Sequence, residues 1–375
     1  MQKIYLDNAA TTQTDKEVLK VMEPFFCDIF GNASSLHSFG QEASKAVEDS
    51  REKIASFLNC ELEEVIFTSG ATEANNIAIQ GLVKEGDHII TTSIEHPSVL
   101  ETCQYLEKKG IEVTYVKPKA NGIIDLQDVE NEIKDNTILI SIMYANNEIG
   151  TIQPIKEIGE IIKDKNIVFH TDAVQATNYL DMDVEKLNVD MLSLSGHKIY
   201  GPKGIGVLFV KKGTKVRKIQ HGGHQEFKLR PGTLNVPGIV GLGKAIELIK
   251  TRDNAEVKEL RDYTWKLILE KIDNVKLNGD LEQRLSNNLN VSIVGVEGEA
   301  LLLGLDMVGV AVSTGSACSS GSLKPSHVLM SLGLSHEESH GSLRISLSKD
   351  NTKEEIEYFV KKLVELVEKY RKMAP

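Results

Sequence analysis

Seven short runs of β-branched and other apolar residues alternate with helix-patterned stretches between about residues 60 and 210. Several runs are apolar at consecutive positions, which is typical of strands that helices cover on both faces. Strands and helices that alternate in this way build a mainly parallel sheet. We therefore expect an α/β fold with a mainly parallel seven-stranded sheet. The runs are residues 65–68, 88–92, 112–116, 137–142, 167–170, 190–194 and 205–210.

The pattern changes after Pro237, where long helix-patterned segments flank short strand-like runs. This texture indicates a smaller α+β domain. We expect a large domain over residues 15–250 and a small domain that combines residues 1–14 with residues 251–375. The helical segments span about 238–272 and 353–372, and the strand-like runs span 290–294 and 342–347.

Composition narrows the class of partner. The 375 residues carry a formal net charge of −11, which argues against direct nucleic-acid binding and against an anionic membrane surface. The N-terminus reaches polar residues too soon for a signal peptide, and no apolar run approaches the roughly 18 residues of a membrane span. The four cysteines lie far apart without a CxxC pair, so a disulfide framework or zinc site is not expected. We expect a cytoplasmic protein.

Polar side chains follow five of the seven runs. In a doubly wound sheet, ligands bind beyond the carboxyl ends of the strands. One such polar cluster would be an ordinary helix cap, but five at one sheet edge suggest a single large polar ligand. The clusters are residues 69–73, 93–96, 144–148, 171–175 and 195–198.

The first and last of these clusters could hold a phosphate. Gly70, Ala71 and Thr72 lie between a strand and a helix, where backbone N–H groups and a hydroxyl favour an anion. A plain N-cap is the alternative for this triplet. Ser195 and His197 could add donors from another strand end. Together the loops indicate a phosphate monoester rather than a dinucleotide, because the GxGxxG turn is absent.

Asp172 and Lys198 could engage the rest of such a ligand. Asp172 ends an apolar strand, where its carboxylate requires a cation such as a protonated ring nitrogen, or else a local Lys or Arg. Lys198 follows another apolar strand, where partial desolvation would favour the neutral amine that Schiff-base formation needs. Most lysines are surface residues, so an ordinary solvent-exposed lysine is the alternative interpretation of Lys198.

Three further side chains could contact a ring. His96 precedes Pro97, which favours an extended backbone and projects the imidazole from the strand end. It could stack on a heterocycle or relay protons, or be a structural histidine. Asn147 and Gln175 could donate hydrogen bonds to a ring hydroxyl, although amides are common at strand ends.

One cysteine differs from the other three. Cys27, Cys60 and Cys103 have apolar neighbours and are interpreted as packing residues. Cys318 lies in residues 313–322, which contain no bulky side chain to bury. We interpret it as an exposed nucleophile, with a flexible linker as the alternative.

Arg344 belongs to a run in which apolar and polar residues alternate over residues 341–347. The alternation places Leu343, Ile345 and Leu347 on the core-facing side and Arg344 on the other. Its guanidinium could therefore fork onto a carboxylate, or simply face solvent.

Six motifs together closely resemble those of the cysteine desulfurases of the NifS/IscS type, in the class V aminotransferase family. The match runs from the first strand almost to the C-terminus. The resemblance implies a fold-type I enzyme that uses pyridoxal 5′-phosphate, forms a homodimer and acts on L-cysteine. The motifs lie at residues 7–12, 68–76, 95–97, 146–150, 195–204 and 315–321.

The resemblance also assigns roles residue by residue. The catalytic residues would be Cys318, Lys198 as the Schiff-base lysine, and His96, which would stack on the cofactor ring. Asp172 would contact the ring nitrogen of the cofactor, and Asn147 and Gln175 would lie near its ring hydroxyl and the substrate. The phosphate would be held by Ala71, Thr72, Ser195 and His197. Thr233 would reach from one subunit to the phosphate bound in the other. Asn147 and Arg344 would bind the substrate, Arg344 through the carboxylate.

The implied reaction leaves L-alanine and a persulfide on Cys318, which passes sulfur to an acceptor protein. An iron–sulfur scaffold, another thio-cofactor pathway or a tRNA thiolation enzyme would receive it, and Cys318 would be a shared iron–sulfur ligand during transfer. Two features depart from the family pattern: the chain ends without the tail that many members use to dock a scaffold, and Phe227 and Pro231 are unusual before Thr233.

Two other functions compete with this reading. A selenocysteine lyase or a small-amino-acid aminotransferase would use the same cofactor with a dispensable Cys318, and residues 313–322 argue against it. A non-catalytic binding or sulfur-carrier protein would not need Lys198, and the full set of cofactor positions argues against that.

Overall fold

A computed structural model describes residues 3–314 and 325–373. Its largest sheet has seven strands in the order β2-β8-β7-β6-β5-β3-β4. β8 alone runs opposite to the other six strands, so the mainly parallel sheet expected from the sequence is confirmed. The strands are β2 (Val65–Thr68), β3 (His88–Thr92), β4 (Glu112–Val116), β5 (Thr137–Ser141), β6 (Val168–Asp172), β7 (Met191–Ser195) and β8 (Gly206–Val210).

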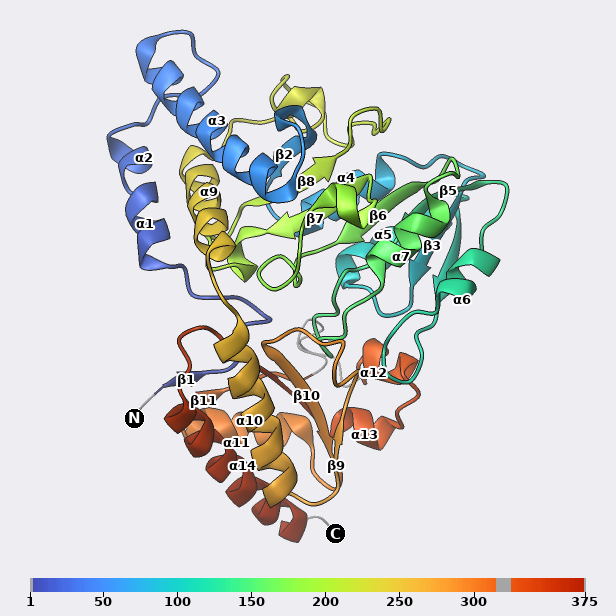
Figure 1. Ribbon diagram of the computed structural model, residues 1–375, viewed down its shortest axis with the longest axis vertical. Coiled ribbons are helices and arrows are strands. Elements are labelled where there is room, and N and C mark those ends of the chain that lie inside the picture. The colour runs from blue at the N-terminus through green and yellow to red at the C-terminus, as the bar shows by residue number, and fades with distance from the viewer. Residues whose placement is uncertain (1–2, 315–324, 374–375) are drawn as a thin grey trace.

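Helices cover both faces of this sheet (Figure 1). One apolar core joins the sheet to α3, α7 and α9, and a second joins the opposite face to α4 and α5. Burial on both sides explains why the strands are apolar at consecutive positions. The helices of this part are α1 (Lys16–Met22), α2 (Pro24–Cys27), α3 (Ser38–Leu58), α4 (Ala71–Gln80), α5 (Pro97–Glu107), α6 (Leu126–Asn131), α7 (Ile155–Ile162), α8 (Val184–Leu187) and α9 (Val236–Lys250), with the 3-10 turns η1 (Leu62–Glu64), η2 (Gly196–Lys198) and η3 (Glu226–Lys228).

A second, smaller assembly lies below the large sheet in Figure 1. It contains the antiparallel sheet β12-β10-β9 and the parallel pair β1-β11. Its core joins Ile4 and Leu6 to apolar residues between positions 257 and 367, so the first strand packs with the C-terminal part. The elements are β1 (Ile4–Tyr5), α10 (Ala255–Lys271), β9 (Val275–Leu277), β10 (Asn288–Ile293), α11 (Gly298–Met307), β11 (Val310–Ala311), α12 (His327–Ser331), α13 (His336–His340), β12 (Ser342–Ser346) and α14 (Lys353–Met373).

The single helical segment expected over about 238–272 is wrong: the structure has two helices, α9 and α10, separated by residues 251–254. Side chains in this break replace helical backbone bonds. Asp253 accepts from the backbone N–H of Ala255, and the Asn254 amide donates to the Asn178 carbonyl. Asp and Asn compete with helices in this way, although neither Gly nor Pro marks the break.

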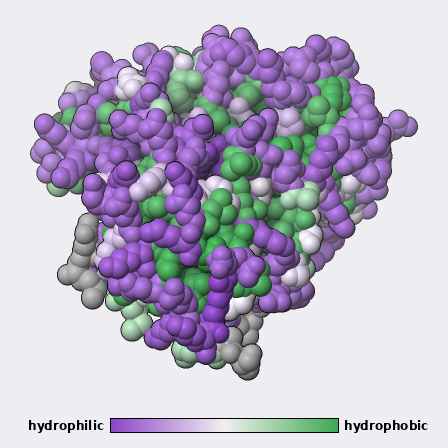
Figure 2. All heavy atoms as spheres, turned by 60° about the horizontal axis from the view of Figure 1, so that its bottom comes forward, coloured by the Kyte–Doolittle hydropathy of each residue, from purple (hydrophilic) through white to green (hydrophobic). Residues whose placement is uncertain are grey.

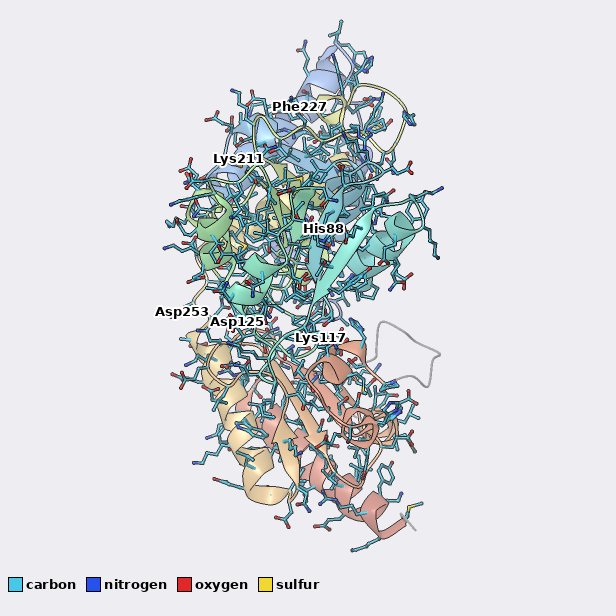
Figure 3. The ribbon with its side chains drawn as sticks, turned by 90° about the vertical axis from the view of Figure 1, so that its right-hand side faces the viewer. His88, Lys117, Asp125, Lys211, Phe227 and Asp253 are labelled. Carbon is cyan, nitrogen blue, oxygen red and sulfur yellow. The ribbon has the colours of Figure 1, made fainter. Side chains whose placement is uncertain are left out.

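The face of the molecule drawn in Figure 2 is mostly hydrophilic. Figure 2 shows the end that carries the small assembly, where apolar residues reach the surface among polar ones. Figure 3 shows Phe227 at the opposite end of the molecule, far from the small sheet. Among the described residues, no helix is long and apolar enough to cross a membrane.

Candidate active site

The carboxyl ends of β2, β3, β5, β6 and β7 meet at one edge of the large sheet, because these strands are mutually parallel. A cavity of about 630 Å³ opens there, which is large enough for a cofactor-sized ligand. The five polar clusters expected at the strand ends all contribute to its wall. The lining includes the expected site residues Ala71, Thr72, His96, Asn147, Asp172, Gln175, Ser195, His197, Lys198 and Arg344.

One end of the cavity is built around Gly70, which precedes α4. Its φ of 153° suits glycine, and it provides no side-chain cap for the helix. A Cβ on Gly206 would lie 2.8 Å from the Gly70 Cα, so the turn packs directly on β8. The first N–H groups of α4, at Ala71 and Thr72, lack intrahelical acceptors and line the cavity. This wall has the form of an anion site rather than a side-chain-capped helix start.

His197 also lines the cavity, and its imidazole is neutral. Its Nδ1 is 3.2 Å from the Thr11 hydroxyl. Burial lowers the pKa of His197 to about 4, and the nearby Lys198 and Lys203 ammonium groups act in the same direction. At neutral pH His197 therefore contributes hydrogen bonds rather than a full positive charge.

Lys198 ends the short 3-10 turn after β7. Its Nζ donates to the backbone carbonyls of Ala9 (2.5 Å) and Ala10 (2.6 Å). These contacts hold the half-buried amine at the cavity wall. The N-terminal segment thus positions the proposed Schiff-base residue, although it lies far from Lys198 in sequence.

Asp172 and His96 belong to one hydrogen-bond chain. The Asn75 amide donates to Asp172 Oδ2 at 2.7 Å and to the Ser98 hydroxyl at 2.9 Å. The Ser98 hydroxyl lies 2.9 Å from His96 Nδ1. The backbone N–H of Val174 completes the contacts of Asp172 at 3.0 Å. Both of these donors are neutral, and Lys198 lines the same cavity, so either its ammonium group or a protonated ring nitrogen of a ligand could supply the cation expected for this carboxylate.

The tautomer of His96 follows from its contacts. His96 is the N-cap of α5, and its Nδ1 accepts the Ser98 backbone N–H at 3.1 Å. The proton of a neutral ring therefore lies on Nε2. Burial lowers the pKa of His96 and Lys198 acts in the same direction, while Asp172 opposes them. His96 is neutral near pH 7, with its extended backbone at φ −64° and ψ 147° as expected before Pro97.

Arg344 closes the cavity from the small sheet. It is 2% exposed, so the alternative of a solvent-facing arginine is wrong: the face opposite the small core packs against the large assembly. Its Nη2 lies 2.8 Å from Asp7 Oδ1, and its Nη1 donates to the Asn147 carbonyl at 3.2 Å. Its buried Nε has no partner among the described residues. A donor in that state suits an additional anionic ligand.

Gln175 is also fixed by the N-terminal segment, since its amide donates to the Ala9 carbonyl at 2.9 Å. Thr233 is different: it is exposed and absent from the cavity wall of its own chain. Its contact with a partner subunit remains a prediction. Cys318, for which we predicted nucleophilic and iron–sulfur roles, lies outside the described residues.

The other cysteines divide into two groups. Cys103 is buried and Cys60 is partly buried against the core. Burial raises the pKa of both thiols to about 12, which makes them poor nucleophiles. Cys27 is exposed, so its interpretation as a packing residue is wrong. The short helix α2 turns it toward solvent despite its apolar neighbours. Within the described ranges, no three His, Cys, Asp or Glu side chains gather as a metal site.

Sequence reasoning gave no role to Asp7 or Asn75, although both lie within motifs that resemble the family. Asp7 pairs with Arg344, and Asn75 joins Asp172 to Ser98. Asn75 follows Ala71 by one helical turn, so its position on the cavity side of α4 could have been found from the helical period. Asp7 offered no comparable local signal.

The sequence also matches known proteins along its length. The model of the class V aminotransferase family matches residues 4–359. The chain belongs to this family. It is 52% identical to a cysteine desulfurase IscS of Clostridium botulinum, over all of this chain and 96% of that protein. It is 51% identical to a cysteine desulfurase IscS of Methanosarcina thermophila, over 99% and 94% of the two chains.

Solved structures agree with this assignment. A NifS-like protein superposes with a TM-score of 0.91 at 39% identity, covering 98% of this chain and all of the other. SspA, solved in complex with cysteine, superposes with a TM-score of 0.83 at 43% identity, covering 92% and 99%. The chain is thus a class V aminotransferase of the cysteine desulfurase type, and the fold expected from the resemblance is confirmed.

Pyridoxal phosphate is the cofactor of this family, and the class V site described here fits it. The Gly70 turn and the N–H groups of α4 suit a phosphate. Asp172, held by neutral donors, suits a protonated ring nitrogen. Lys198 points its amine to the same cavity from the end of β7. A phosphate site, a carboxylate and an amine on one wall are the three functional groups that this cofactor requires.

Proposed function

We propose that the chain is a cysteine desulfurase that converts L-cysteine to L-alanine and leaves the sulfur as a persulfide on Cys318. The observation that carries the proposal is the single cavity in which Lys198, Asp172, His96 and Arg344 meet. The family assignment and the similarity to desulfurases over the full length support it. A cysteine-bound relative of the same fold supports the choice of substrate.

The cofactor would be held by residues of the large sheet edge. Lys198 would bind it covalently, Asp172 would face the ring nitrogen, and the Gly70 turn with Ser195 and His197 would hold the phosphate. When bound, pyridoxal phosphate supplies an electron sink that stabilises negative charge next to the amino group of the substrate. Asn147 and Gln175 lie on the wall near these groups.

The substrate would be oriented from the small assembly. Arg344 presents a guanidinium fixed by Asp7 and by the Asn147 carbonyl. A carboxylate can accept from its unpartnered Nε, which anchors one end of the amino acid. A fixed guanidinium loses little conformational entropy when it binds, so it orients the substrate at low cost.

His96 is placed to donate a hydrogen bond from Nε2 to a ligand in the cavity. Its Nδ1 is occupied by Ser98, so Nε2 bears the hydrogen of the neutral ring. The imidazole stays neutral near pH 7 because burial lowers its pKa. A neutral imidazole held in this way donates a hydrogen bond from Nε2, while Nδ1 cannot take up a proton as long as Ser98 occupies it.

Cys318 would complete the reaction as a thiolate. Its sulfur forms an S–S bond with the substrate sulfur, and the Cβ–Sγ bond of cysteine breaks. The electron pair left on carbon takes up a proton as alanine forms, so no external oxidant or reductant is needed. The buried Cys60 and Cys103 thiols, with pKa raised to about 12, are unsuited to this role.

Alanine formation tests the proposal directly. The purified protein, loaded with pyridoxal phosphate, is mixed with L-cysteine, and alanine and persulfide are quantified by mass spectrometry. We expect one alanine per sulfur transferred, and loss of the persulfide in Cys318→Ala. Full sulfur release by Cys318→Ala would overturn the desulfurase assignment. 3-Mercaptopyruvate, the keto acid that corresponds to cysteine, in place of alanine would indicate an aminotransferase, and pyruvate with free sulfide would indicate a lyase.

We also infer a homodimer that delivers sulfur to an acceptor protein in the cytoplasm, with iron–sulfur scaffolds as the first candidates. Exposed aromatic residues on and near α2 and α3 support self-association. Phe30 and Phe39 pack with ring centroids 5.7 Å apart, and each remains more than half exposed.

Light scattering tests whether the chain forms a homodimer. Mixed Lys198→Ala and Thr233→Ala dimers test whether Thr233 serves the partner subunit, and pull-down of persulfide-linked proteins tests the acceptor. A Cys318-ligated cluster would appear by absorption during transfer.

A further inference from the structure

Glu148 is a buried carboxyl group that the proposed reaction does not use. It is 5% exposed and follows Asn147 directly on the loop after β5. One of its oxygens, Oε2, accepts from the Ser326 hydroxyl at 2.5 Å. A buried carboxylate is costly unless it is well satisfied, so its presence beside the cavity calls for a role.

Ser326, the hydrogen-bond partner of Glu148, lies at the start of helix α12. Ser326 is the N-cap of α12, and its hydroxyl also accepts from the backbone N–H of Leu329 at 3.3 Å. In sequence it follows Cys318 by eight residues, close to Pro325, where the described structure resumes. Figure 1 shows α12 between the large and small sheets. Glu148 therefore fixes the first turn of the helix that the chain enters after Cys318.

Further contacts make this attachment specific. His327 Nε2 lies 3.0 Å from the Glu95 carbonyl, on the loop that carries His96. Val328, Leu329 and Leu332 pack into a separate apolar cluster. Their partners in that cluster are Ile94, Met143 and Ile149, which come from the same strand-end loops as His96 and Asn147. The start of α12 is thus bound to loops of the cavity and not to the small core.

The other side of the Cys318 segment is attached to the substrate side of the cavity. Ser313 and Arg344 exchange backbone hydrogen bonds, with N···O distances of 3.1 and 2.7 Å. Arg344 also contacts the carbonyl of Asn147, the residue before Glu148. Both sequence flanks of Cys318 are therefore held within one network around Asn147 and Arg344.

We propose that Glu148 is a positioning residue for sulfur transfer, which fixes Ser326 and the start of α12 relative to the substrate-binding residues. This inference rests on the proposed function, because it concerns the sulfur attack by Cys318. Without the Glu148–Ser326 contact, the start of α12 loses one of its two polar attachments to the cavity loops and retains that of His327. The reacting sulfur atoms then meet less often, while cofactor and substrate still bind.

Three variants isolate the contact. Glu148→Ala and Ser326→Ala each remove it, whereas Glu148→Gln keeps an oxygen acceptor of the same shape. We expect the first two to lower kcat for alanine and persulfide formation about tenfold, with KM for cysteine and the cofactor absorbance unchanged. Glu148→Gln should recover most of the rate. The double variant should be no slower than either single variant, because both remove one interaction.

Backbone hydrogen exchange of the unloaded protein gives a readout that is independent of activity. We expect the amides of α12 to exchange about tenfold faster in Glu148→Ala, and those of β6 to be unchanged. Ser335→Ala is the matched control: Ser335 caps the equally short α13, but neither Ser335 nor its partner Glu338 lines the cavity. That variant should speed exchange in α13 and leave kcat at the wild-type value.

The outcomes separate the two proposals. Wild-type α12 exchange in Glu148→Ala, or a kcat loss matched by an equal loss of cofactor affinity, would overturn the positioning role. If Glu148→Ala fails to fold, an unchanged kcat in Ser326→Ala overturns it instead. Full alanine formation by Cys318→Ala would overturn the desulfurase proposal, and the exchange experiment would still decide whether Glu148 anchors α12.

Discussion

The cavity has two sides that are built in different ways. On the large-sheet side, Asp172, His96 and Lys198 stand at ends of parallel strands and share dense hydrogen bonds with neutral groups. On the small-assembly side, Arg344 stands in the middle of β12 and depends on Asp7 and one carbonyl. Strand order brings the first group to one edge, where the N-terminal segment also holds Lys198, whereas the position of Arg344 depends entirely on how separate parts of the chain dock. We expect the two sides to respond differently to substitution.

The largest effect should come from the large-sheet side. Lys198→Ala removes the only amine proposed to bind the cofactor covalently, so we expect alanine formation to fall by at least about a thousandfold. The cofactor absorbance should change with it. Lys211→Ala is the control, because Lys211 lies at the end of β8, is largely exposed and is absent from the cavity wall (Figure 3). Turnover by Lys198→Ala near the wild-type rate would contradict the assignment.

A smaller and different effect should follow on the other side. Arg344→Lys keeps the charge but loses the fork that a carboxylate recognises, so KM for cysteine should rise about tenfold to a hundredfold. Cofactor affinity should stay unchanged, whereas Asp172→Ala should weaken it. Steady-state kinetics and cofactor titration measure the two quantities separately. If Arg344→Lys weakened cofactor and substrate alike, the cavity would not be divided as described.

The same division explains what the sequence could predict. Parallel strands end at one edge, so Asp172, Lys198 and the other strand-end residues could be assigned to one cavity from their positions alone. Asp7 could not, because its pairing with Arg344 depends on how the first strand packs on the small core. The burial of Arg344 could not be predicted from the sequence either. Alternation in β12 tells which face meets the core, but not that the other face meets a second assembly.

Acid should affect the large-sheet side through its buried histidine. His170 lies within β6, between the Ser141 and Ser193 hydroxyls, and burial lowers its pKa to about 3. In the unfolded chain the pKa is near 6.5, so protonation favours unfolding. The contribution of neutral His170 to the free energy of unfolding is complete above about pH 6.5 and is lost as pH falls toward 3.

Between pH 7 and pH 5 this titration should lower the free energy of unfolding by about 2 kcal/mol. Urea titrations at the two pH values measure the change. His170→Asn removes the titrating group and keeps an amide near the Nδ1 position, within reach of the Ser141 hydroxyl, so its stability should vary less with pH by about that amount. An unaltered pH dependence in the variant would assign the acid sensitivity to other residues.

The smallest effect on kcat should come from Ser98→Ala, because two separate groups of Ser98 contact the His96 ring. The Ser98 hydroxyl and the Ser98 backbone N–H both reach Nδ1, and only the hydroxyl is lost. One neutral hydrogen bond contributes about 1 kcal/mol, so kcat should fall about fivefold, with KM unchanged. Thr102→Val is the matched control, because it removes a buried hydroxyl of α5 that bonds only the Ser98 carbonyl. A loss as large as that of Lys198→Ala would show that the network to Asp172 acts as one unit and has no redundancy. A modest loss would show that duplicated contacts protect the large-sheet side, a protection that the single ion pair of Arg344 lacks.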